Sequence, residues 1–220
     1  MGIRRVVAFA GTAPDLDGKA LIEKILDRVQ SNWHKGKSRS NENWRWRKNI
    51  NLAQENKSRE VVLERLIVRT TEDDWVNQVP IASGLTRSGG GRRAIDLVHR
   101  CGNGWYEFIE LKVDERGGTP LFAAIEILQY GILYIFSREN AQTLGYKEID
   151  EGLLGATGIH PRVLAPATYY AEYNLSWLEK SINSGLGNFL AQRRLGFKMD
   201  FKFETLSLIP SCSPVTWRTV

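Results

Sequence analysis

The sequence predicts an α/β (α+β) fold in which helices flank a mixed central sheet. Three observations predict this class. The chain has 220 residues, of which 42% are hydrophobic, so it can bury a core as one domain, with or without an added subdomain. Its central patterns run in the order helix, strand, strand, strand, helix, strand. Two of these strands flank Gly102-Asn103-Gly104, a connection typical of a hairpin.

The N-terminal region, residues 1–57, is predicted to be an addition to a core formed by residues 58–220. Its apolar run over 4–10 has the composition of a short strand, and the apolar residues of 18–31 recur at helical spacing. Residues 32–57 show little periodicity, which predicts a loop.

A helix, a strand and a second helix surround the hairpin in sequence. Ser58 offers an N-cap for the first helix, and apolar residues follow it at helical spacing. Residues 75–82 have the composition of a strand, and Pro80 places that strand at a sheet edge or a bulge. Thr119 and the proline after it open a helix over 120–136, which is apolar nearly all round, so we expect it to be buried.

The C-terminal part adds further elements. Residues 137–160 are predicted to be rich in loops, and the segment 162–173 to contain a strand. A helix is predicted over 175–194, and residues 197–208 alternate like a half-exposed strand. The predicted order of elements in the core is therefore αβββαβ, with additions at both ends.

The hairpin carries polar residues inside otherwise apolar strands. Side chains two apart on a strand share a face, so Glu110 and Lys112 project together. A three-residue loop over 102–104 pairs Cys101 with the residue after the loop, and the same register places Asp96 directly opposite Glu110. A two-residue loop would shift the register and turn the two acids to opposite faces.

This pairing of two carboxylates predicts a metal site. Opposed carboxylates repel each other, which destabilises a purely structural sheet. A divalent cation between them reverses the sign of that interaction, and Mg²⁺ prefers a few carboxylates together with waters and phosphate oxygens. An ammonium group beside the metal, here that of Lys112, can hold an attacking water or offset charge in a phosphoryl transition state.

The same residues resemble a known family. An acid on one strand and an acid-any-lysine tripeptide on the next, here Asp96 and Glu110-Leu111-Lys112, resemble the PD-(D/E)XK nuclease superfamily, which shares the restriction-endonuclease-like fold. The resemblance covers roughly residues 58–136. It implies a restriction-endonuclease-like core and a Mg²⁺-dependent phosphodiesterase acting on nucleic acid, with Mn²⁺ as a substitute. The tripeptide pattern also occurs at 17–19, 55–57 and 200–202. Only 110–112 follows a strand that carries an acid.

The resemblance also assigns roles to residues. A glutamate often lies on the helix before the first strand of this family, and Glu60 is the candidate here, with Glu64 one turn later as the alternative. Asp96, Glu110 and Glu60 are then expected to hold the metal, and Lys112 is expected to position the hydrolytic water.

The helix after the hairpin bears on the type of activity. Gln129 is a candidate for a hydrogen bond to a site ligand or to DNA. The Gln-x-x-x-Tyr pattern of the RecB-like exonuclease branch is not met, because position 133 is leucine. This favours an endonuclease. The alternative is a catalytically silent nuclease-like fold that binds nucleic acid or a protein partner, although a purely binding protein has no physical reason to keep the complete acid set.

Positive charge is concentrated in the segment from His34 to Arg59, where the excess of basic residues is larger than the net charge of +5 for the whole chain. Tryptophans among cations suit a phosphate backbone with stacked bases, but a solvated loop anchored by its tryptophans fits equally well. The expected partner is DNA, with RNA as the alternative. The candidate contacts are Arg45, Arg47, Lys48, Trp44, Trp46, Arg92 and Arg93.

Other potentially reactive residues are predicted to be structural. His99 is three residues from Asp96, and residues an odd number apart on a strand face opposite sides of the sheet. It is therefore expected to face away from the acids as a packing residue. Cys101 and Cys212 lie far apart and form no metal-spaced pair, which favours inert thiols in a cytoplasmic setting. The apolar run over 121–136 is interrupted by polar residues, so we expect no membrane-spanning segment.

Overall fold

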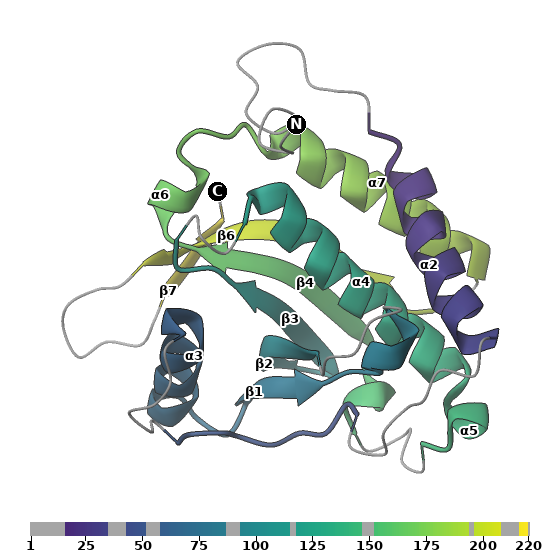
Figure 1. Ribbon diagram of the computed structural model, residues 1–220, viewed down its shortest axis with the longest axis horizontal. Helices are drawn as coiled ribbons and strands as arrows, with labels where there is room; N and C mark the ends of the chain where they lie inside the picture. Colours follow the sequence, from purple (N-terminus) through teal and green to yellow (C-terminus); the bar gives the residue numbers. More distant parts are fainter. Residues whose placement is uncertain are drawn as a thin grey trace.

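The computed structural model describes residues 16–34, 43–51, 58–86, 93–114, 118–146, 152–193, 196–207 and 216–219 (Figure 1). Several features discussed above fall outside these ranges: the strand expected over 4–10, Arg92, Cys212 and most of the basic segment. The elements are helices α2 (Gly18–His34), α3 (Arg59–Thr70), α4 (Pro120–Glu139), α5 (Ala141–Leu144), α6 (Ala167–Tyr170) and α7 (Ser176–Arg193), the 3₁₀ turns η1 (Ser83–Leu85) and η3 (Leu153–Gly155), and strands β1 (Trp75–Pro80), β2 (Ala94–Gly102), β3 (Trp105–Leu111), β4 (Gly158–Ala165), β5 (Lys198–Met199), β6 (Lys202–Ser207) and β7 (Thr216–Thr219).

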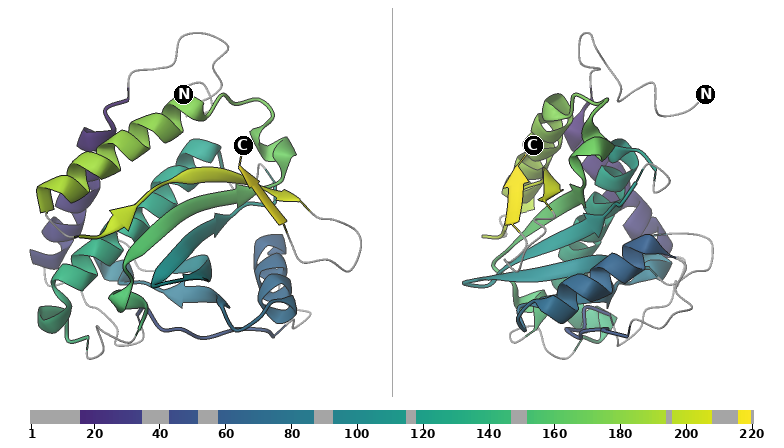
Figure 2. Two further views of the ribbon diagram at one scale, coloured as in Figure 1. Left: turned by 180° about the vertical axis from the view of Figure 1, so that it is seen from behind. Right: turned by 90° about the vertical axis from the view of Figure 1, so that its left-hand side faces the viewer.

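The strands form one mixed sheet, which confirms the predicted fold class. Their order is β1-β2-β3-β4-β6-β7, with β5 paired to β4 beside β6, and the strands from β6 to β1 can be followed in Figure 2. The pairs β1–β2, β2–β3 and β6–β7 are antiparallel, whereas β4 runs parallel to both β3 and β6. Parallel neighbours need a crossover, and α4 lies on the connection from β3 to β4. The predicted edge position of Pro80 is confirmed, because β1 ends the sheet.

Helices cover both faces of the sheet. The larger core contains the apolar residues of α4 together with Val98, Phe108 and Val163 from the strands, and α2 and α7 contribute to the same core. Figure 1 shows α4 crossing the sheet, with α2 and α7 beyond it. On the other face, Ile67 and Val68 of α3 pack with alternate strand residues in a smaller cluster. The N-terminal helix α2 therefore shares its core with elements of the 58–220 region.

Two glycines set the crossing of α2 and α7. A Cβ atom on Gly18 would lie 1.9 Å from the carbonyl oxygen of Ser181, and one on Gly185 would lie 2.4 Å from the backbone of Gly18. The backbones of the two helices therefore meet directly, and any larger side chain would force them apart.

Helix α4 is long and apolar enough to cross a membrane by length and composition, but most of it is buried inside the protein. It begins where predicted, with Thr119 as the N-cap and proline in its first turn, and it continues to Glu139. Helices that are apolar all round are typical of the centre of a core, which is the position of α4 here.

The C-terminal elements differ from the predicted ones in two places. Tyr169 and Tyr170 lie on α6 rather than on a strand, and β4 begins earlier than expected, at Gly158. The predicted strand over 197–208 is interrupted between β5 and β6. The interruption has a physical reason: the Asn183 side chain accepts a hydrogen bond from the Phe201 backbone amide (2.7 Å) and donates one to its carbonyl (2.9 Å), so these groups do not pair with β4.

The hairpin turn differs from prediction in form but not in consequence. Gly102 pairs with Trp105 across a two-residue turn, and Asn103 and Gly104 both have positive φ (51° and 76°). Such a turn alone would shift the register, but a bulge at Cys101 inserts one extra residue into β2. The two changes cancel. Beyond the bulge the pairs are Leu97 with Ile109 and Val98 with Phe108, which is the predicted register.

Candidate active site

The base of the hairpin positions the first acid. Leu97 and Ile109 are the last paired residues of the β2–β3 ladder, and the same register places Asp96 opposite Glu110. Beyond that pair, the Asp96 carboxylate accepts a hydrogen bond from the backbone amide of Leu111 (2.9 Å). The half-buried Asp96 side chain therefore takes the place of a backbone acceptor between β2 and β3, and this hydrogen bond fixes its position against β3.

Glu110 and Lys112 project together from β3, as their spacing predicts. Both side chains are buried, and the Lys112 ammonium donates to Glu110 Oε1 at 2.5 Å. The backbone amide of Lys112 donates to the Leu164 carbonyl in β4, which continues the parallel pairing past the end of β3. Both side chains thus lie on well-anchored backbone.

Helix α3 brings a third carboxylate, and here the structure distinguishes the two candidates. Ser58 is the N-cap, as predicted, and its side chain accepts from the amide of Val61. Glu64 is only 1% exposed and accepts a hydrogen bond from the Gln78 side chain (2.5 Å). Glu60, one turn earlier, is partly exposed, although its charge is felt at Glu64 and Asp96. Glu64, the alternative in the sequence interpretation, occupies the buried position.

The electrostatics show that these acids share one environment. The pKa of Asp96 is raised to about 8, first by burial and then by the Glu64 charge, against the opposing effects of Lys112 and the Leu111 amide. The pKa of Glu64 is likewise raised to about 8, because burial and the Glu110 charge together outweigh the hydrogen bond from Gln78, which lowers it. The pKa of Glu110 lies well above its ordinary value because of burial and the Asp96 charge. Without a bound cation, this cluster retains protons at neutral pH.

The lysine in the cluster is a permanent cation. Burial lowers the pKa of Lys112, but the Glu110 carboxylate and its hydrogen bond outweigh burial, so the net effect raises the pKa above its ordinary value. An ammonium that holds its proton this firmly can donate hydrogen bonds or offset negative charge, but it cannot serve as a general base at neutral pH.

Sequence reasoning missed Gln78, and it left open whether Glu126 joins the acids or pairs with a lysine or arginine. Gln78 has a positive φ of 51° within β1, an unusual conformation for a residue other than glycine. Glu126 of α4 adds a fourth carboxylate, whose charge raises the pKa of Glu110; it accepts from Arg93 (2.7 Å) and from the Tyr130 hydroxyl (2.9 Å). The signal for Glu126 was its position on a helix that is otherwise apolar.

Tyr169 was another residue with an unrecognised position. Burial raises the pKa of its hydroxyl, and the charges of Lys112 and Glu110 both act on it. Its hydroxyl oxygen is buried and has no hydrogen-bond partner among the described residues. The sequence predicted only that the segment 162–173 contains a strand, and the α6 turn after β4 brings this tyrosine towards the acids.

Two of the expected nucleic-acid contacts are structural. Trp44 is 4% exposed and packs edge-on against Tyr134 in the main core, so its ring cannot stack on bases. Lys48 donates to the carbonyls of Thr71 (3.2 Å) and Glu72 (2.8 Å) just after α3, where a cation balances the negative end of the helix. The expectation for Trp44 is corrected, and Lys48 anchors the segment to the body while it also lines the pocket described below.

Trp46 and the two arginines beside it occupy different environments. The Trp46 ring packs edge-on against Tyr106, and the guanidinium of Arg100 lies 4.6 Å from the ring centroid, so this ring is largely engaged within the protein. Arg45 and Arg47 are exposed. The expectation of a nucleic-acid contact stays open for these two arginines.

The segment 43–51 runs along the edge strand β1 (Figure 1) and lines a basic pocket together with residues of that strand. The Trp44 amide donates to the Pro80 carbonyl (2.7 Å), and the Asn49 amide donates to the Asn77 side chain (2.8 Å). The pocket has a volume of about 450 Å³ and is lined by Arg45, Arg47, Lys48, Asn49, Ile50, Asn51, Asn77, Gln78 and Pro80. Because Gln78 also binds Glu64, the pocket borders the acid cluster.

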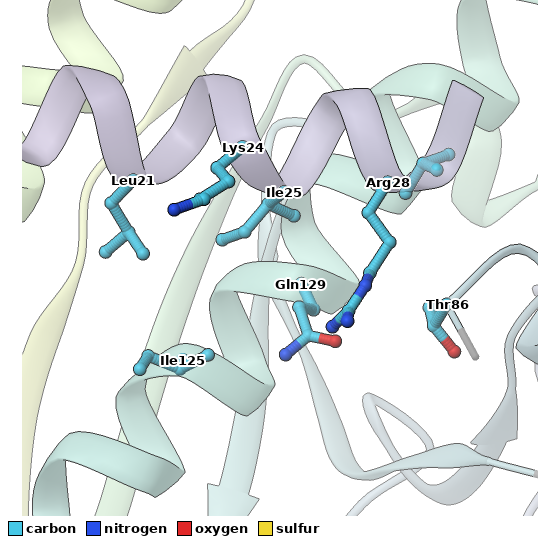
Figure 3. A pocket seen from close by; sticks show the side chains of 8 residues that line it. Leu21, Lys24, Ile25, Arg28, Thr86, Ile125 and Gln129 are labelled. Carbon is cyan, nitrogen blue, oxygen red and sulfur yellow. The ribbon is translucent and has the colours of Figure 1, made fainter. Parts of the chain in front are cut away.

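Gln129 lies elsewhere, in a pocket of about 400 Å³ between α2 and α4. Figure 3 shows its amide beside Arg28 of α2, with Lys24 further along the same helix. The expectation that Gln129 contacts a ligand in the acid cluster has no support among its contacts. Arg93, the other residue expected to bind nucleic acid near the hairpin, is engaged by Glu126.

His99 faces away from the acids, as expected from its spacing from Asp96, but it is more than a packing residue. Its ring stacks on Trp75 (4.2 Å between centroids) and its Nδ1 lies 2.8 Å from Glu107 Oε2. Burial lowers the pKa of His99, whereas hydrogen bonds to Cys101 and Glu107 outweigh burial and raise it to about 10.

Comparisons with known proteins identify no relative: no family model, curated protein or solved structure matches this chain.

Proposed function

We propose that this protein is a Mg²⁺-dependent nuclease that hydrolyses phosphodiester bonds in DNA as an endonuclease, with a PD-(D/E)XK type of site. The observation that supports this most strongly is the cluster formed by the buried Glu110 and Glu64 with the half-buried Asp96. Three clustered carboxylates with raised pKa values destabilise a protein that has no use for them. A divalent cation would remove that destabilisation.

The donor set fits magnesium. Oxygen donors from a few carboxylates, with room for water and phosphate, are what Mg²⁺ prefers, and the cluster offers carboxylate oxygens without a thiol or imidazole. Asp96, Glu110 and Glu64 would hold the ion, with Glu60 at the more exposed side. When bound, the ion would supply Lewis-acid polarisation of the scissile phosphate.

Lys112 would act as a fixed hydrogen-bond donor and positive charge. Its ammonium is held by Glu110 at 2.5 Å on the backbone that pairs with β4, so its position is set before substrate arrives. From there it would orient the hydrolytic water and offset charge that develops on the phosphoryl oxygens.

The basic pocket beside β1 supports a nucleic-acid substrate. The exposed Arg45 and Arg47 line this pocket together with Gln78, which contacts Glu64, so a phosphate backbone bound in the pocket would lie beside the acids. The chain also carries a net charge of +5, which suits a polyanion. DNA in the cytoplasm is the proposed partner, with RNA as the alternative substrate.

The test is a cleavage assay on supercoiled plasmid and on single-stranded DNA and RNA with Mg²⁺, Mn²⁺ or EDTA. We expect metal-dependent cleavage by the wild type, internal cuts that linearise the plasmid, and loss of cleavage in Asp96→Asn and in Lys112→Met. Cleavage that persists in both variants would reveal a contaminating nuclease and refute the proposal.

A binding assay separates catalysis from the alternative of a silent nuclease-like fold. Fluorescence anisotropy with labelled DNA would show binding by wild type and Asp96→Asn alike, with Arg45→Gln plus Arg47→Gln reducing the salt dependence of binding by about two phosphate contacts. Binding that is indifferent to metal, without cleavage of any substrate, would favour the silent binding module.

A further inference from the structure

A second cluster of potential metal ligands lies near the tip of the hairpin, facing away from the acids. His99 and Glu107 are paired across β2 and β3, and Cys101 follows two residues after His99 at the bulge. The Nδ1 atom of His99, the Sγ atom of Cys101 and a carboxylate oxygen of Glu107 all lie within 4.8 Å of one another. These groups belong neither to the proposed magnesium site nor to the basic pocket.

We propose that His99, Cys101 and Glu107 form a binding site for a zinc-type transition-metal ion. Imidazole, thiolate and carboxylate are the three kinds of side chain that bind Zn²⁺, and three protein ligands plus water form a common four-coordinate site. A thiolate and an imidazole disfavour Mg²⁺, which takes oxygen ligands. The hairpin would therefore carry two metal sites, separated by ligand chemistry.

The distances are compatible with this geometry. Ligand atoms about 2.1–2.3 Å from a tetrahedral zinc lie roughly 3.5 Å from one another. The Sγ atom of Cys101 lies 3.7 Å from His99 Nδ1, which is close to that separation. Glu107 Oε2 lies 2.8 Å from the same nitrogen, a hydrogen bond that the ion would replace by moving the carboxylate outward slightly. Cys101 is exposed, so an ion from solvent can reach the cluster.

The surroundings of His99 resemble those of a metal-binding histidine. When Nδ1 binds a metal, the other ring nitrogen usually donates to a carboxylate, which fixes the tautomer and the orientation of the ring. Here His99 Nε2 lies 3.4 Å from Asp74 Oδ2, on the side of the ring away from Glu107. The Trp75 ring stacks on the imidazole at 4.2 Å and holds its plane. Asp74 is thus a positioning residue and not a ligand.

The other oxygen of Glu107 is directed to a different partner. Glu107 Oε1 lies 3.9 Å from Arg162 Nε, so Oε2 remains for the ion. Zinc binding would replace protons on the Cys101 thiol and the His99 imidazole and release them to solvent, with no oxidation or reduction. The bound ion would join the bulge of β2 to β3 and stabilise the far end of the hairpin.

The test uses Co²⁺ as a spectroscopic probe for this site, in buffer with excess Mg²⁺ to occupy oxygen-rich sites. We expect one equivalent of Co²⁺ to produce a near-ultraviolet thiolate-to-cobalt charge-transfer band, and Zn²⁺ to abolish it. Cys101→Ser should lose the band, while Cys212→Ser, the matched cysteine control, and Glu110→Gln should keep it. Circular dichroism of each variant checks folding.

Competition with a chromophoric chelator then measures zinc affinity. Cys101→Ser is expected to weaken Zn²⁺ binding at least tenfold, and Asp74→Asn about tenfold while keeping the charge-transfer band, since the hydrogen-bond partners of metal ligands contribute about 10–100-fold to metal affinity. The proposal is overturned if the wild type shows no saturable band, if the band persists in Cys101→Ser, or if it also disappears in Cys212→Ser. None of these results depends on nuclease activity.

Discussion

Glu107 and Glu110 lie only three residues apart on β3, yet their pKa values shift in opposite directions, because the two side chains face opposite sides of the sheet. Burial raises the pKa of both carboxyls. At Glu107, the hydrogen bond from His99 and the charges of His99 and Arg162 outweigh burial and lower the pKa. At Glu110, the Asp96 charge adds to burial, and Lys112 opposes it only in part, so the pKa rises.

The two ends of the hairpin differ in whether the protein itself supplies enough positive charge to balance its carboxylates. Near the tip, Glu107 is surrounded by cationic partners supplied by the protein itself. At the base, the carboxylates of Asp96, Glu110 and Glu64 outnumber the one ammonium of Lys112 among the groups that act on them most strongly. A buried, anion-rich cluster of this kind is stabilised by a cation from outside. The base is therefore where magnesium is expected.

The largest expected effect is on cleavage. Glu110→Gln keeps the shape of the side chain but removes a metal ligand, so we expect metal-dependent cleavage to fall by about 10³-fold or more, the scale on which a single electrostatic group at a reacting centre acts. Glu107→Gln, its matched control on the opposite face, should retain cleavage within a few-fold. Plasmid cleavage at saturating Mg²⁺ measures both. Equal losses in the two variants would show that the faces do not differ in function.

Next in size is the effect on stability of removing a cation from the cluster near the hairpin tip. Arg162 is 5% exposed, and its guanidinium lies 3.0 Å from Asp200 Oδ2 and 3.1 Å from Glu204 Oε1. Arg162→Met would leave these carboxylates and Glu107 without their shared cation. We expect a loss of about 3 kcal/mol in the free energy of unfolding, the lower end of what breaking a buried ion pair costs.

Urea unfolding measures this loss, and Arg193→Met is its control. Arg193 is bonded to Glu139 in a more exposed setting, with side-chain exposures of 23% and 24%, so its removal should lower stability by less than about 1 kcal/mol. If the two substitutions lower the free energy of unfolding equally, Arg162 does not stabilise the carboxylates near the hairpin tip more than an ordinary surface ion pair would.

The hairpin shows how far the sequence predicts this site. The alternation of β2 and β3 predicted which side chains share a face, and the predicted register opposes Asp96 and Glu110. The turn itself was predicted wrongly, because a bulge at Cys101 and a two-residue turn give the same register as a three-residue loop. Local sequence does not distinguish these solutions, since glycine and asparagine suit both.

Contacts between distant elements were harder to predict. Glu60 and Glu64 are one helical turn apart, and only the docking angle of α3 on β1 and β2 decides which is buried. Trp44 and Lys48 look the same in sequence whether they bind phosphates or anchor a segment along β1. The site near the tip depends on the cross-strand pair His99–Glu107 together with Asp74 from the turn before β1. The alternation of side chains along β2 predicted which face His99 occupies, but it did not predict these partners.

A moderate effect is expected in the pH dependence of stability without metal. Asp96 has a pKa of about 8 in the folded protein against an ordinary value of 3.8, so between these values the folded chain holds a proton that the unfolded chain has lost. The stabilisation from this proton is complete below about pH 4 and is lost as the pH rises through 8. In EDTA, the free energy of unfolding should therefore fall by up to about 1.4 kcal/mol per pH unit across this window for each such proton.

Thermal or urea unfolding in EDTA at about pH 6 and about pH 8 measures this slope. Asp96→Asn cannot lose a proton, so its stability should fall less steeply than that of the wild type. Adding Mg²⁺ at the higher pH should restore much of the wild-type stability and little of that of the variant. A wild-type slope no steeper than that of Asp96→Asn would show that the carboxyl is already ionised.

The smallest effect distinguishes the two glutamates of α3. Glu64 is buried against Gln78 and its pKa responds to Glu110, whereas Glu60 is partly exposed and acts through water-screened charge. Glu64→Gln should weaken binding of Mn²⁺, measured by titration calorimetry, by about tenfold, the scale of one carboxylate ligand or one close opposite charge in a site of this kind. Glu60→Gln should weaken it only about twofold to threefold, because a solvated charge contributes well under 1 kcal/mol. The reverse order would make Glu60 the ligand and Glu64 a protonated hydrogen-bond partner of Gln78, and it would move the metal towards the exposed N-terminal turn of α3.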